Sequence, residues 1–190
     1  MCIRDRPEPT LSEVLIRVTA AGLCHSDLHV QKGYMDLGEE GRLTFAERGA
    51  QLPMTFGHEI AGIVEAVGDK VKNVSIGQQV LVFPWIGCGD CLACNEDRES
   101  DCSAMRIIGL KQKGGFATHC LIENEKFLVN IDGLDAAEVV PHACSGITVY
   151  NALEKIGFLR DGEWLAIMGC GGLGLNAIAI AGAMGFENVI

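Results

Sequence analysis

The chain has 190 residues, of which 48% are hydrophobic, and its formal net charge at pH 7 is −10. This apolar content supports a buried core and excludes an intrinsically disordered protein. The acidic balance repels phosphate backbones and anionic lipids, so we expect neither nucleic acid nor a membrane surface as a partner. No apolar run approaches the roughly 18 residues of a transmembrane helix, and the N-terminus lacks the apolar segment of a signal peptide. We therefore expect a cytoplasmic protein.

The two features that most affect this first interpretation are the cysteine content and the N-terminus. In a reducing cytosol, nine cysteines are metal ligands or buried thiols rather than disulfides. The first six residues, MCIRDR, match what a sequencing-library adapter encodes, so we expect a scar there, with a short native leader as the alternative. If they are a scar, the chain is a piece of a longer protein.

The N-terminal two thirds of the chain has the pattern of short strands separated by turns. Residues 14–131 therefore predict an all-β unit or a partly open barrel. Residues 32–55 are polar and glycine-rich and predict a long loop, with one helical turn around 43–48. The predicted strands are 14–20, 60–67, 80–83, 116–122 and 127–131.

The C-terminal part changes character. Residues 136–140 and 147–156 predict helices, and residues 164–168 predict a short apolar strand. The segment GCGGLG at 169–174 follows, then a helix of small residues at 173–184 and the beginning of a strand at 188–190. This order is typical of a β–α unit that opens a parallel sheet.

Four cysteines lie within the fifteen residues CGDCLACNEDRESDC. Thiolates two residues apart wrap a turn around one cation, and an all-cysteine tetrahedron is typical of a closed, structural zinc site. An iron–sulfur cluster is an alternative, but its sequence pattern places the fourth cysteine after three residues and before a proline. Here seven residues intervene and Ser103 follows. Four incidental thiols are the remaining alternative. The predicted zinc ligands are Cys88, Cys91, Cys94 and Cys102.

A second set of ligand residues is scattered along the chain. Cys24 follows the first predicted strand, His58 precedes the next one, and Cys144 opens a helical stretch. Each is weak alone, because a lone histidine or cysteine is more often a buried structural side chain. Together they form a ligand set of catalytic zinc sites, which leave one position open. The sequence by itself does not bring them together.

Several of these motifs occur in the order found in one protein family. GLCHSD at 22–27, GHE at 57–59, the four-cysteine loop, ACSGIT at 143–148 and GCGGLG at 169–174 resemble the zinc-dependent medium-chain alcohol dehydrogenases, over residues 8–190. The resemblance implies an α/β fold overall. A mostly-β, GroES-like catalytic domain would span 7–150, with its structural zinc loop at 88–102. The N-terminal fragment of a Rossmann cofactor-binding domain would span 151–190.

The resemblance also implies roles at the catalytic metal. Cys24, His58 and Cys144 would hold the catalytic Zn²⁺, and Glu59 would lie beside it and exchange as a ligand. Asp27 would accept a hydrogen bond from a ligand histidine and so fix its ring.

Further residues would handle the proton and the cofactor. By resemblance, Ser26 would accept the alcohol proton and pass it, through cofactor hydroxyls, to His29. His25 would approach the cofactor pyrophosphate, and Thr148 would pack on the nicotinamide side.

The glycine motif lies between an apolar strand and a helix, the context that a dinucleotide-binding fingerprint requires. Its first glycine makes the turn, the second lets the backbone approach the pyrophosphate, and the third allows close helix–strand packing. The acidic residue that would bind the ribose falls at or beyond Ile190, so NAD and NADP both remain open. The expected cofactor-binding residues are Gly169, Gly171, Gly172, Leu173 and Gly174.

The predicted function is a zinc-dependent oxidoreductase that transfers a hydride between an alcohol and NAD or NADP. Its partners would be small alcohols, aldehydes or ketones, and the full-length protein would be a homo-oligomer. The resemblance implies that much of the cofactor domain is missing, so we expect this chain alone to be inactive. The alternative is a non-catalytic zinc-binding module that serves structure or assembly.

Overall fold

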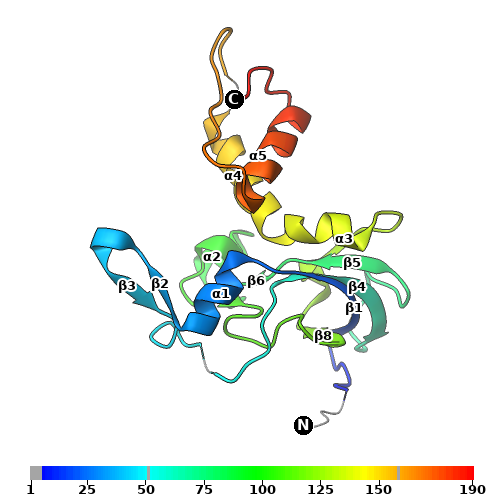
Figure 1. Cartoon of the computed structure of the whole chain (residues 1–190). Helices are drawn as coiled ribbons and strands as arrows, with labels where there is room; N and C mark the ends of the chain where they lie inside the picture. The colour runs from blue at the N-terminus through cyan, green and yellow to red at the C-terminus, as the bar shows by residue number, and fades with distance from the viewer. Residues whose placement is uncertain (1–5, 51, 158) are drawn as a thin grey trace. The chain divides into compact units, whose positions relative to one another are not determined.

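The computed structural model describes residues 6–50, 52–157 and 159–190 (Figure 1). The chain forms two compact units, of which the first ends at Val140 and the second spans Pro141–Ile190. The domain boundary expected at residue 150 falls inside a helix of the second unit. Compactness within this chain is a different criterion from the domain division of a whole protein, so the assignment of 7–150 and 151–190 stays a prediction.

The first unit is built on a five-stranded antiparallel sheet with the strand order β8-β1-β4-β5-β9. All five strands overlap the strands predicted from the sequence, although β8 begins three residues later than expected. The long central pair, β1 and β4, holds the β-branched residues that favour extended backbone. The strands are β1 (Val14–Gly22), β4 (Glu59–Val67), β5 (Gln79–Val82), β8 (His119–Ile122) and β9 (Leu128–Asn130).

One face of this sheet forms the core of the first unit. Valines and isoleucines at alternate positions of β1, β4 and β5 have no exposed surface, as the two-residue period of a strand requires. Burying a side chain of this size stabilises the fold by about 1.5–3 kcal/mol. The strands that carry the candidate site are therefore anchored rigidly. The buried set includes Val14, Ile16, Ile60, Val64, Val80 and Val82.

The segment predicted as a long loop contains a small hairpin instead. The strands β2 (Tyr34–Asp36) and β3 (Arg42–Thr44) pair antiparallel beside α1 (His25–Lys32), with a 3₁₀ turn at Gly38–Glu40 between them (Figure 1). The Arg42 guanidinium lies 4.4 Å from the centre of the Tyr34 ring. This cation–π contact and three backbone pairs hold the hairpin together. The sequence has no alternating apolar pattern here, so it did not predict the two strands.

The helical turn expected around 43–48 is also wrong. Backbone N–H groups there close hydrogen-bonded turns, with Arg48 donating to the Phe45 carbonyl and Gly49 to that of Ala46, and no helix forms. Gly49 has a φ of +89°, which ends the turn. Conversely, α1 forms in a segment for which the sequence pattern predicted no helix.

Short elements complete the first unit. The strands β6 (Trp85–Ile86) and β7 (Arg106–Ile107) pair and flank the four-cysteine segment, which contains α2 (Leu92–Asn95) and a 3₁₀ turn at Glu99–Asp101. Another 3₁₀ turn, Glu125–Phe127, precedes β9. The helix α3 (Ala136–Val139), predicted from the sequence, begins at Asp135, whose side chain accepts a hydrogen bond from the Ala137 N–H. The 3₁₀ helix Val140–Ala143 follows it.

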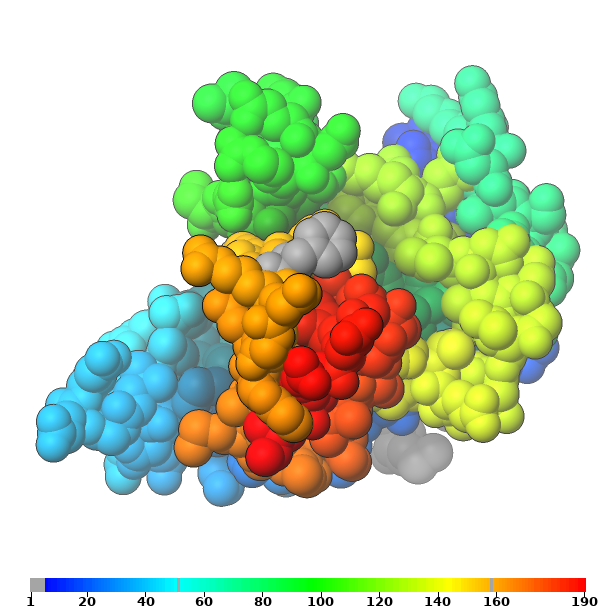
Figure 2. Space-filling view, turned by 90° about the horizontal axis from the view of Figure 1, so that it is seen from above, coloured from blue at the N-terminus to red at the C-terminus, as the bar shows by residue number. Residues whose placement is uncertain are grey.

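The second unit contains the helices α4 (Ser145–Ile156) and α5 (Gly172–Ala183). The predicted strand at 164–168 is reduced to one parallel bridge, from Leu165 to Val189. The Ile167 N–H extends this pairing by donating to the Ile190 carbonyl at 2.7 Å. Figure 2 shows the orange segment that precedes α5 lying along the red C-terminal residues. This order of extended segment, helix and extended segment agrees with the β–α unit that the sequence predicts.

Within the described ranges, no helix combines the length and the apolar character needed to cross a membrane.

Candidate metal centres and cofactor loop

The four-cysteine loop brings its thiols together through short local elements. Cys88 follows β6, Cys91 precedes α2, Cys94 lies within α2, and Cys102 ends the 3₁₀ turn at Glu99–Asp101. The four sulfur atoms all lie within 4.8 Å of one another. The segment thus arranges four potential ligands around one point.

The spacing of these sulfur atoms fits a tetrahedral zinc site. With Zn–S bonds of about 2.3 Å, the sulfurs of a regular tetrahedron are about 3.8 Å apart. The Cys88 and Cys94 sulfurs are 3.9 Å apart, and those of Cys91 and Cys94 are 3.5 Å apart. The chemistry of the donor set and its geometry therefore both fit Zn²⁺.

Two of the thiols have pKa values shifted in opposite directions. The backbone N–H groups of Asp90 and Cys91 donate to the Cys88 sulfur and lower its pKa to about 6. The Gly89 N–H also favours the thiolate of Cys94, but burial and the neighbouring thiols outweigh it and raise the pKa of Cys94 to about 11. Cys88 therefore ionises readily, while burial and the repulsion from neighbouring thiolates keep Cys94 protonated. A divalent cation at the centre removes that repulsion.

A glycine and two ion pairs hold this loop in place. A Cβ atom at Gly87 would lie 2.5 Å from the Cys94 sulfur and 2.5 Å from a side-chain carbon of Glu99, so only glycine fits. The Glu99 carboxylate pairs with Lys126, and this pairing lowers its pKa. Arg106 donates two hydrogen bonds of 2.6 Å to Glu123. None of these contacts is indicated by the sequence pattern.

The second cluster is assembled by strand register. In the β1–β4 pair, Gly22 lies opposite Glu59, so the end of β1 lies beside the start of β4. Cys24 and His58 flank these positions, and the ligand atoms of Cys24, His58 and Glu59 lie within 4.8 Å of one another. A Cβ atom at Gly22 would lie 2.0 Å from a Glu59 carboxylate oxygen. Gly22 therefore leaves the space that the carboxylate occupies.

Asp27 organises the backbone around this cluster. Its carboxylate accepts hydrogen bonds from the Cys24 N–H at 3.0 Å and from the Gly57 N–H at 3.1 Å. One of its oxygens lies 3.5 Å from His58 Nδ1, a distance for an ion pair but too long for a hydrogen bond. The side chains of Asp27 and His58 are each only 3% exposed. The Asp27 carboxylate thus lies next to the Nδ1 atom of the His58 ring.

The electrostatics of the cluster favour a bound cation. Burial opposes the charged form of His58, but Asp27 and the Cys24 sulfur outweigh it and raise the pKa of His58 to about 9. Burial, and then the Cys24 charge, raise the pKa of Glu59 to about 7. The pKa of Asp27 is lowered in spite of burial, because His58 and the Cys24 N–H stabilise the carboxylate. Two buried carboxyls beside a half-buried thiol need a positive charge nearby for all three groups to ionise.

The other predicted residues near this cluster lie on α1 and α4. Ser26, His25 and His29 are all on α1, with His25 exposed and the other two half-buried. Cys144, the third expected ligand, immediately precedes α4 in the second unit. Thr148 lies one turn into α4, where its hydroxyl donates to the Cys144 carbonyl at 2.9 Å. The catalytic and ligand roles assigned to these residues stay predictions.

The glycine motif of the second unit has the geometry of a strand–turn–helix junction. Gly169 has a φ of +95°, which a residue with a side chain rarely adopts. A Cβ atom at Gly174 would lie 1.8 Å from the Gly169 carbonyl oxygen, so the helix start approaches the turn closely. Gly171 is the N-cap of α5, and Gly172 and Leu173 begin its first turn. The free N–H groups of such a turn are suited to bind an anion.

One contact in the second unit had no counterpart in the sequence interpretation. The Asn176 side chain, on the otherwise apolar α5, donates to the Ser145 hydroxyl at 2.6 Å. Ser145 in turn donates to the Pro141 carbonyl at 3.0 Å. The sequence feature that could have indicated this contact is Asn176, a single polar residue in an apolar helix.

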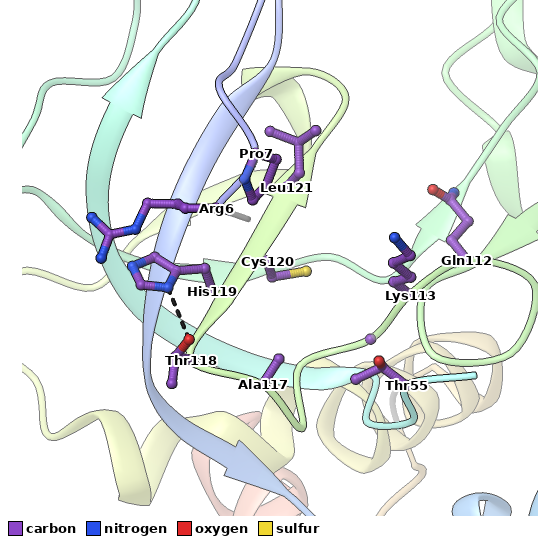
Figure 3. Close-up of a pocket in the computed structure, with 11 residues that line it drawn as sticks. Arg6, Pro7, Thr55, Gln112, Lys113, Ala117, Thr118, His119, Cys120 and Leu121 are labelled. Atoms are coloured by element: carbon purple, nitrogen blue, oxygen red, sulfur yellow. Dashed lines mark hydrogen bonds between the residues drawn. The ribbon is translucent and has the colours of Figure 1, made fainter. Parts of the chain in front are cut away.

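The two described cavities lie away from all the predicted site residues. The larger cavity, of about 560 Å³, is in the first unit beside β8, and its lining is drawn in Figure 3. Two of its ionisable groups share a partner outside the lining, because Arg6 and His119 both pair with Glu65, and His119 also contacts the Thr118 hydroxyl at 3.0 Å. The second cavity, of about 220 Å³, is lined by residues 159–163 and 184–188. Cavity size therefore does not locate the candidate site.

Comparison with known proteins agrees with the fold. Residues 10–133 match the family described as "Alcohol dehydrogenase GroES-like domain", and the chain belongs to this family. It is 41% identical over 186 residues to an NAD-dependent alcohol dehydrogenase of Sulfurisphaera tokodaii, covering 97% of this chain and 52% of that protein. The chain therefore spans about half the length of the curated relatives it matches.

Solved structures agree. The alcohol dehydrogenase of Aeropyrum pernix matches with a TM-score of 0.84 at 30% identity, over 98% of this chain and 53% of that one. The D-arabinose dehydrogenase of Sulfolobus solfataricus matches with a TM-score of 0.83 at 31% identity, over 98% and 55%. The family and the α/β fold predicted from the sequence motifs are thus confirmed.

Proposed function

We propose that this chain is part of a zinc-dependent oxidoreductase that transfers a hydride between an alcohol and a nicotinamide dinucleotide. The observation that carries the proposal is the cluster of Cys24 with the buried side chains of His58 and Glu59, and with Asp27 next to the imidazole Nδ1. A half-buried thiol, a buried imidazole and a buried carboxylate at one point form a donor set suited to Zn²⁺. The names of the relatives, which are alcohol dehydrogenases, support the same reaction.

The residues at this cluster would hold the catalytic metal. Cys24 and His58 supply two ligands, and we propose Cys144 as the third, leaving a position for the substrate oxygen. Glu59 is the alternative ligand, because its carboxylate lies among the same donor atoms. Zn²⁺ bound here would lower the pKa of a coordinated alcohol, as it does for bound water. Asp27 would fix the orientation of His58.

The proton released by the alcohol needs an exit, for which α1 supplies two groups. Ser26 would accept the proton on its hydroxyl, and His29, one turn further along the same helix, would pass it to solvent. A hydroxyl suits this relay because it both accepts and donates. His29 is half-buried, so its ring reaches both the protein interior and water.

The glycine motif would hold the dinucleotide. The positive φ of Gly169 and the close approach of Gly174 create a backbone cradle at the start of α5. A pyrophosphate there would accept hydrogen bonds from the free N–H groups of the first turn. His25 would add a basic group for the same phosphates, and Thr148 would contact the nicotinamide side. NAD and NADP both fit this proposal.

The four-cysteine loop would hold a second, structural zinc, so two zinc ions per chain are proposed. Elemental analysis of the purified 190-residue chain after dialysis tests this count. We expect two zinc ions in the wild type, one in Cys144→Ser and one in Cys91→Ser. A single zinc in the wild type that Cys144→Ser does not remove would contradict the role of Cys144. The exposed Cys170 provides the matched control, because Cys170→Ser should change nothing.

The activity itself is tested in a full-length protein that carries this chain. The zinc-loaded protein is mixed with a panel of primary, secondary and sugar alcohols and either NAD⁺ or NADP⁺, and the reduced nicotinamide is followed by absorbance. We expect turnover with at least one alcohol, and a loss of several orders of magnitude in kcat/KM for Cys144→Ser with an unchanged melting temperature. Full zinc loading without turnover would favour a non-catalytic zinc-binding module.

The remaining features of the proposal concern the whole protein. Its substrates would be small alcohols, with aldehydes or ketones as products, and it would act as a homo-oligomer in the cytoplasm. A reducing compartment keeps thiolate ligands available for zinc. Light scattering of the full-length protein tests the oligomer, and a monomer would contradict it.

A further inference from the structure

Two histidines of α1 lie against each other in a geometry that their proposed individual roles do not require. His25 and His29 are four residues apart, and their ring centres are 4.6 Å apart with a tilt of 39° between the ring planes. His25 is exposed and His29 half-buried, whereas Asp27 and Val30 of the same helix are buried. The two rings therefore share the outer face of the helix, where ions in solution can reach them.

Residues four apart on a helix are neighbours on one face, so two imidazoles at this spacing can bind the same metal ion. The same spacing lets the two histidines of an H-E-x-x-H helix hold zinc. An imidazole lone pair suits Cu²⁺, Ni²⁺ and Zn²⁺, with Cu²⁺ bound most tightly. The two metal-ligand clusters found among the described residues include neither ring, so this pair is a separate donor set.

We propose that His25 and His29 form a two-histidine site on α1 for a late first-row divalent metal ion, and that its occupation inhibits the enzyme. Each ring would give one nitrogen to the ion, and water would fill the other positions. The inhibition rests on the proposed function: a coordinated His29 can no longer carry a proton, and a coordinated His25 can no longer contact phosphate. Binding of the ion does not depend on that function.

Binding is tested on the zinc-replete 190-residue chain with Cu²⁺–iminodiacetate as the probe. The chelator leaves two positions that match a histidine pair and limits exchange of copper into the thiolate sites. Pulsed electron paramagnetic resonance counts the coordinated imidazoles. We expect two in the wild type, and at most one in His25→Asn and in His29→Asn, each with affinity lower by on the order of 100-fold because chelation is lost.

Three comparisons keep this test decisive. His142→Asn, in the second unit, is the control and should retain two coordinated imidazoles. Circular dichroism and zinc content should match the wild type in each variant, and the exposed His25 is the position that best tolerates exchange. One imidazole in the wild type, or equal affinity in all the variants, would overturn the site and leave a simple ring contact.

The consequence for the enzyme is tested separately in the full-length protein with excess Ni²⁺. The inhibition constant for Ni²⁺ should rise in His25→Asn by the same factor by which its binding weakens, whatever the basal activity of the variant. Two coordinated imidazoles without inhibition would leave the metal site standing, but would overturn the inhibition and the catalytic roles proposed for His25 and His29.

Discussion

The two candidate metal centres of this protein are built in opposite ways. In the four-cysteine loop, all four donor atoms are sulfurs and come from fifteen consecutive residues. The cluster of Cys24, His58 and Glu59 takes its donors from segments more than thirty residues apart in the sequence. Its charged partner, Asp27, is almost completely buried.

This difference indicates a division of labour. A centre made of one loop folds around its metal, so metal binding contributes directly to the stability of that loop. A centre at the joined ends of two long strands is positioned by the sheet, which folds for its own hydrophobic reasons. The first should behave as a structural element, and the second as a preorganised site whose ligands can be altered without unfolding the chain.

The largest expected effect comes from breaking each centre in turn. Cys91→Ser should remove the structural zinc and lower the free energy of unfolding by about 5 kcal/mol or more, since structural zinc contributes strongly to folding. For a chain of this size, that corresponds to a fall in Tm of about 10–20 °C. Cys24→Ser should remove the other zinc and lower Tm by only a few degrees. Thermal unfolding with zinc analysis measures both, and equal losses of Tm would contradict the division of labour.

Two glycines give a subtler version of the same comparison. Alanine at Gly87 would put its Cβ against the Cys94 sulfur, so Gly87→Ala should weaken zinc binding at the loop and lower Tm together. Alanine at Gly22 would collide with Glu59, and overpacking of this kind costs about 1–3 kcal/mol. We expect Gly22→Ala to displace the carboxylate and weaken zinc binding at the Cys24 cluster. Gly172→Ala, where nothing lies within 4 Å, is the control and should leave both zinc affinities unchanged.

The same contrast explains what the sequence could predict. The cysteine loop was predictable because its donors lie close together in the sequence. The five strands of the main sheet were predictable because apolar residues recur in short runs bounded by turns. The hairpin β2–β3 was missed because it is held by the Tyr34–Arg42 contact and not by an apolar pattern. The helix α1 was missed because its N-terminus depends on Asp27, which is engaged with two backbone N–H groups.

The assembled cluster shows the limit of sequence reasoning most clearly. The individual residues were named through a family resemblance, but the role of Gly22 follows only from its register opposite Glu59. Similarly, the structure shows that the lack of a side chain at Gly87 makes room for Cys94, which the sequence does not indicate. Contacts between distant segments depend on register, which periodicity does not specify to a single residue here.

The centres should also differ in the pH dependence of zinc binding. In the metal-free protein the pKa of His58 is raised to about 9, so its ring is protonated at neutral pH and must lose that proton to bind zinc. Affinity at this cluster should rise about tenfold per pH unit for each proton released, up to about pH 9. Asp27→Asn removes the carboxylate that raises this pKa and should reduce proton release. Calorimetry in buffers of different ionisation enthalpy measures it, and unchanged proton release in Asp27→Asn would contradict the assignment.

The raised pKa of His58 also determines how the stability of the metal-free fold changes with pH. Because the folded pKa of His58 lies above its unfolded value near 6.5, the pair stabilises the metal-free fold fully below that value. This contribution is lost as the pH rises through about 9. The lowered pKa of Asp27 adds stability that is present above about 3.9 and lost on further acidification. The melting temperature of the EDTA-treated chain should therefore fall between pH 6.5 and 9, and less so in Asp27→Asn.

The smallest expected effect tests whether the cysteine loop depends on its surroundings as well as its metal. Glu99→Gln breaks the ion pair with Lys126, and partly exposed pairs of this kind contribute at most about 1 kcal/mol. The pKa of Glu99 is lowered by Lys126, so this contribution is present above pH 4.5 and is lost as the pH falls through the folded pKa. We expect Tm to fall by less than about 4 °C at neutral pH, with two zinc ions retained, and the difference to shrink at high salt. Glu96→Gln, which breaks an exposed pair with Arg98, is the matched control. Loss of zinc in Glu99→Gln alone would mean that the loop is positioned by the sheet after all, and the contrast between the two centres would become one of degree.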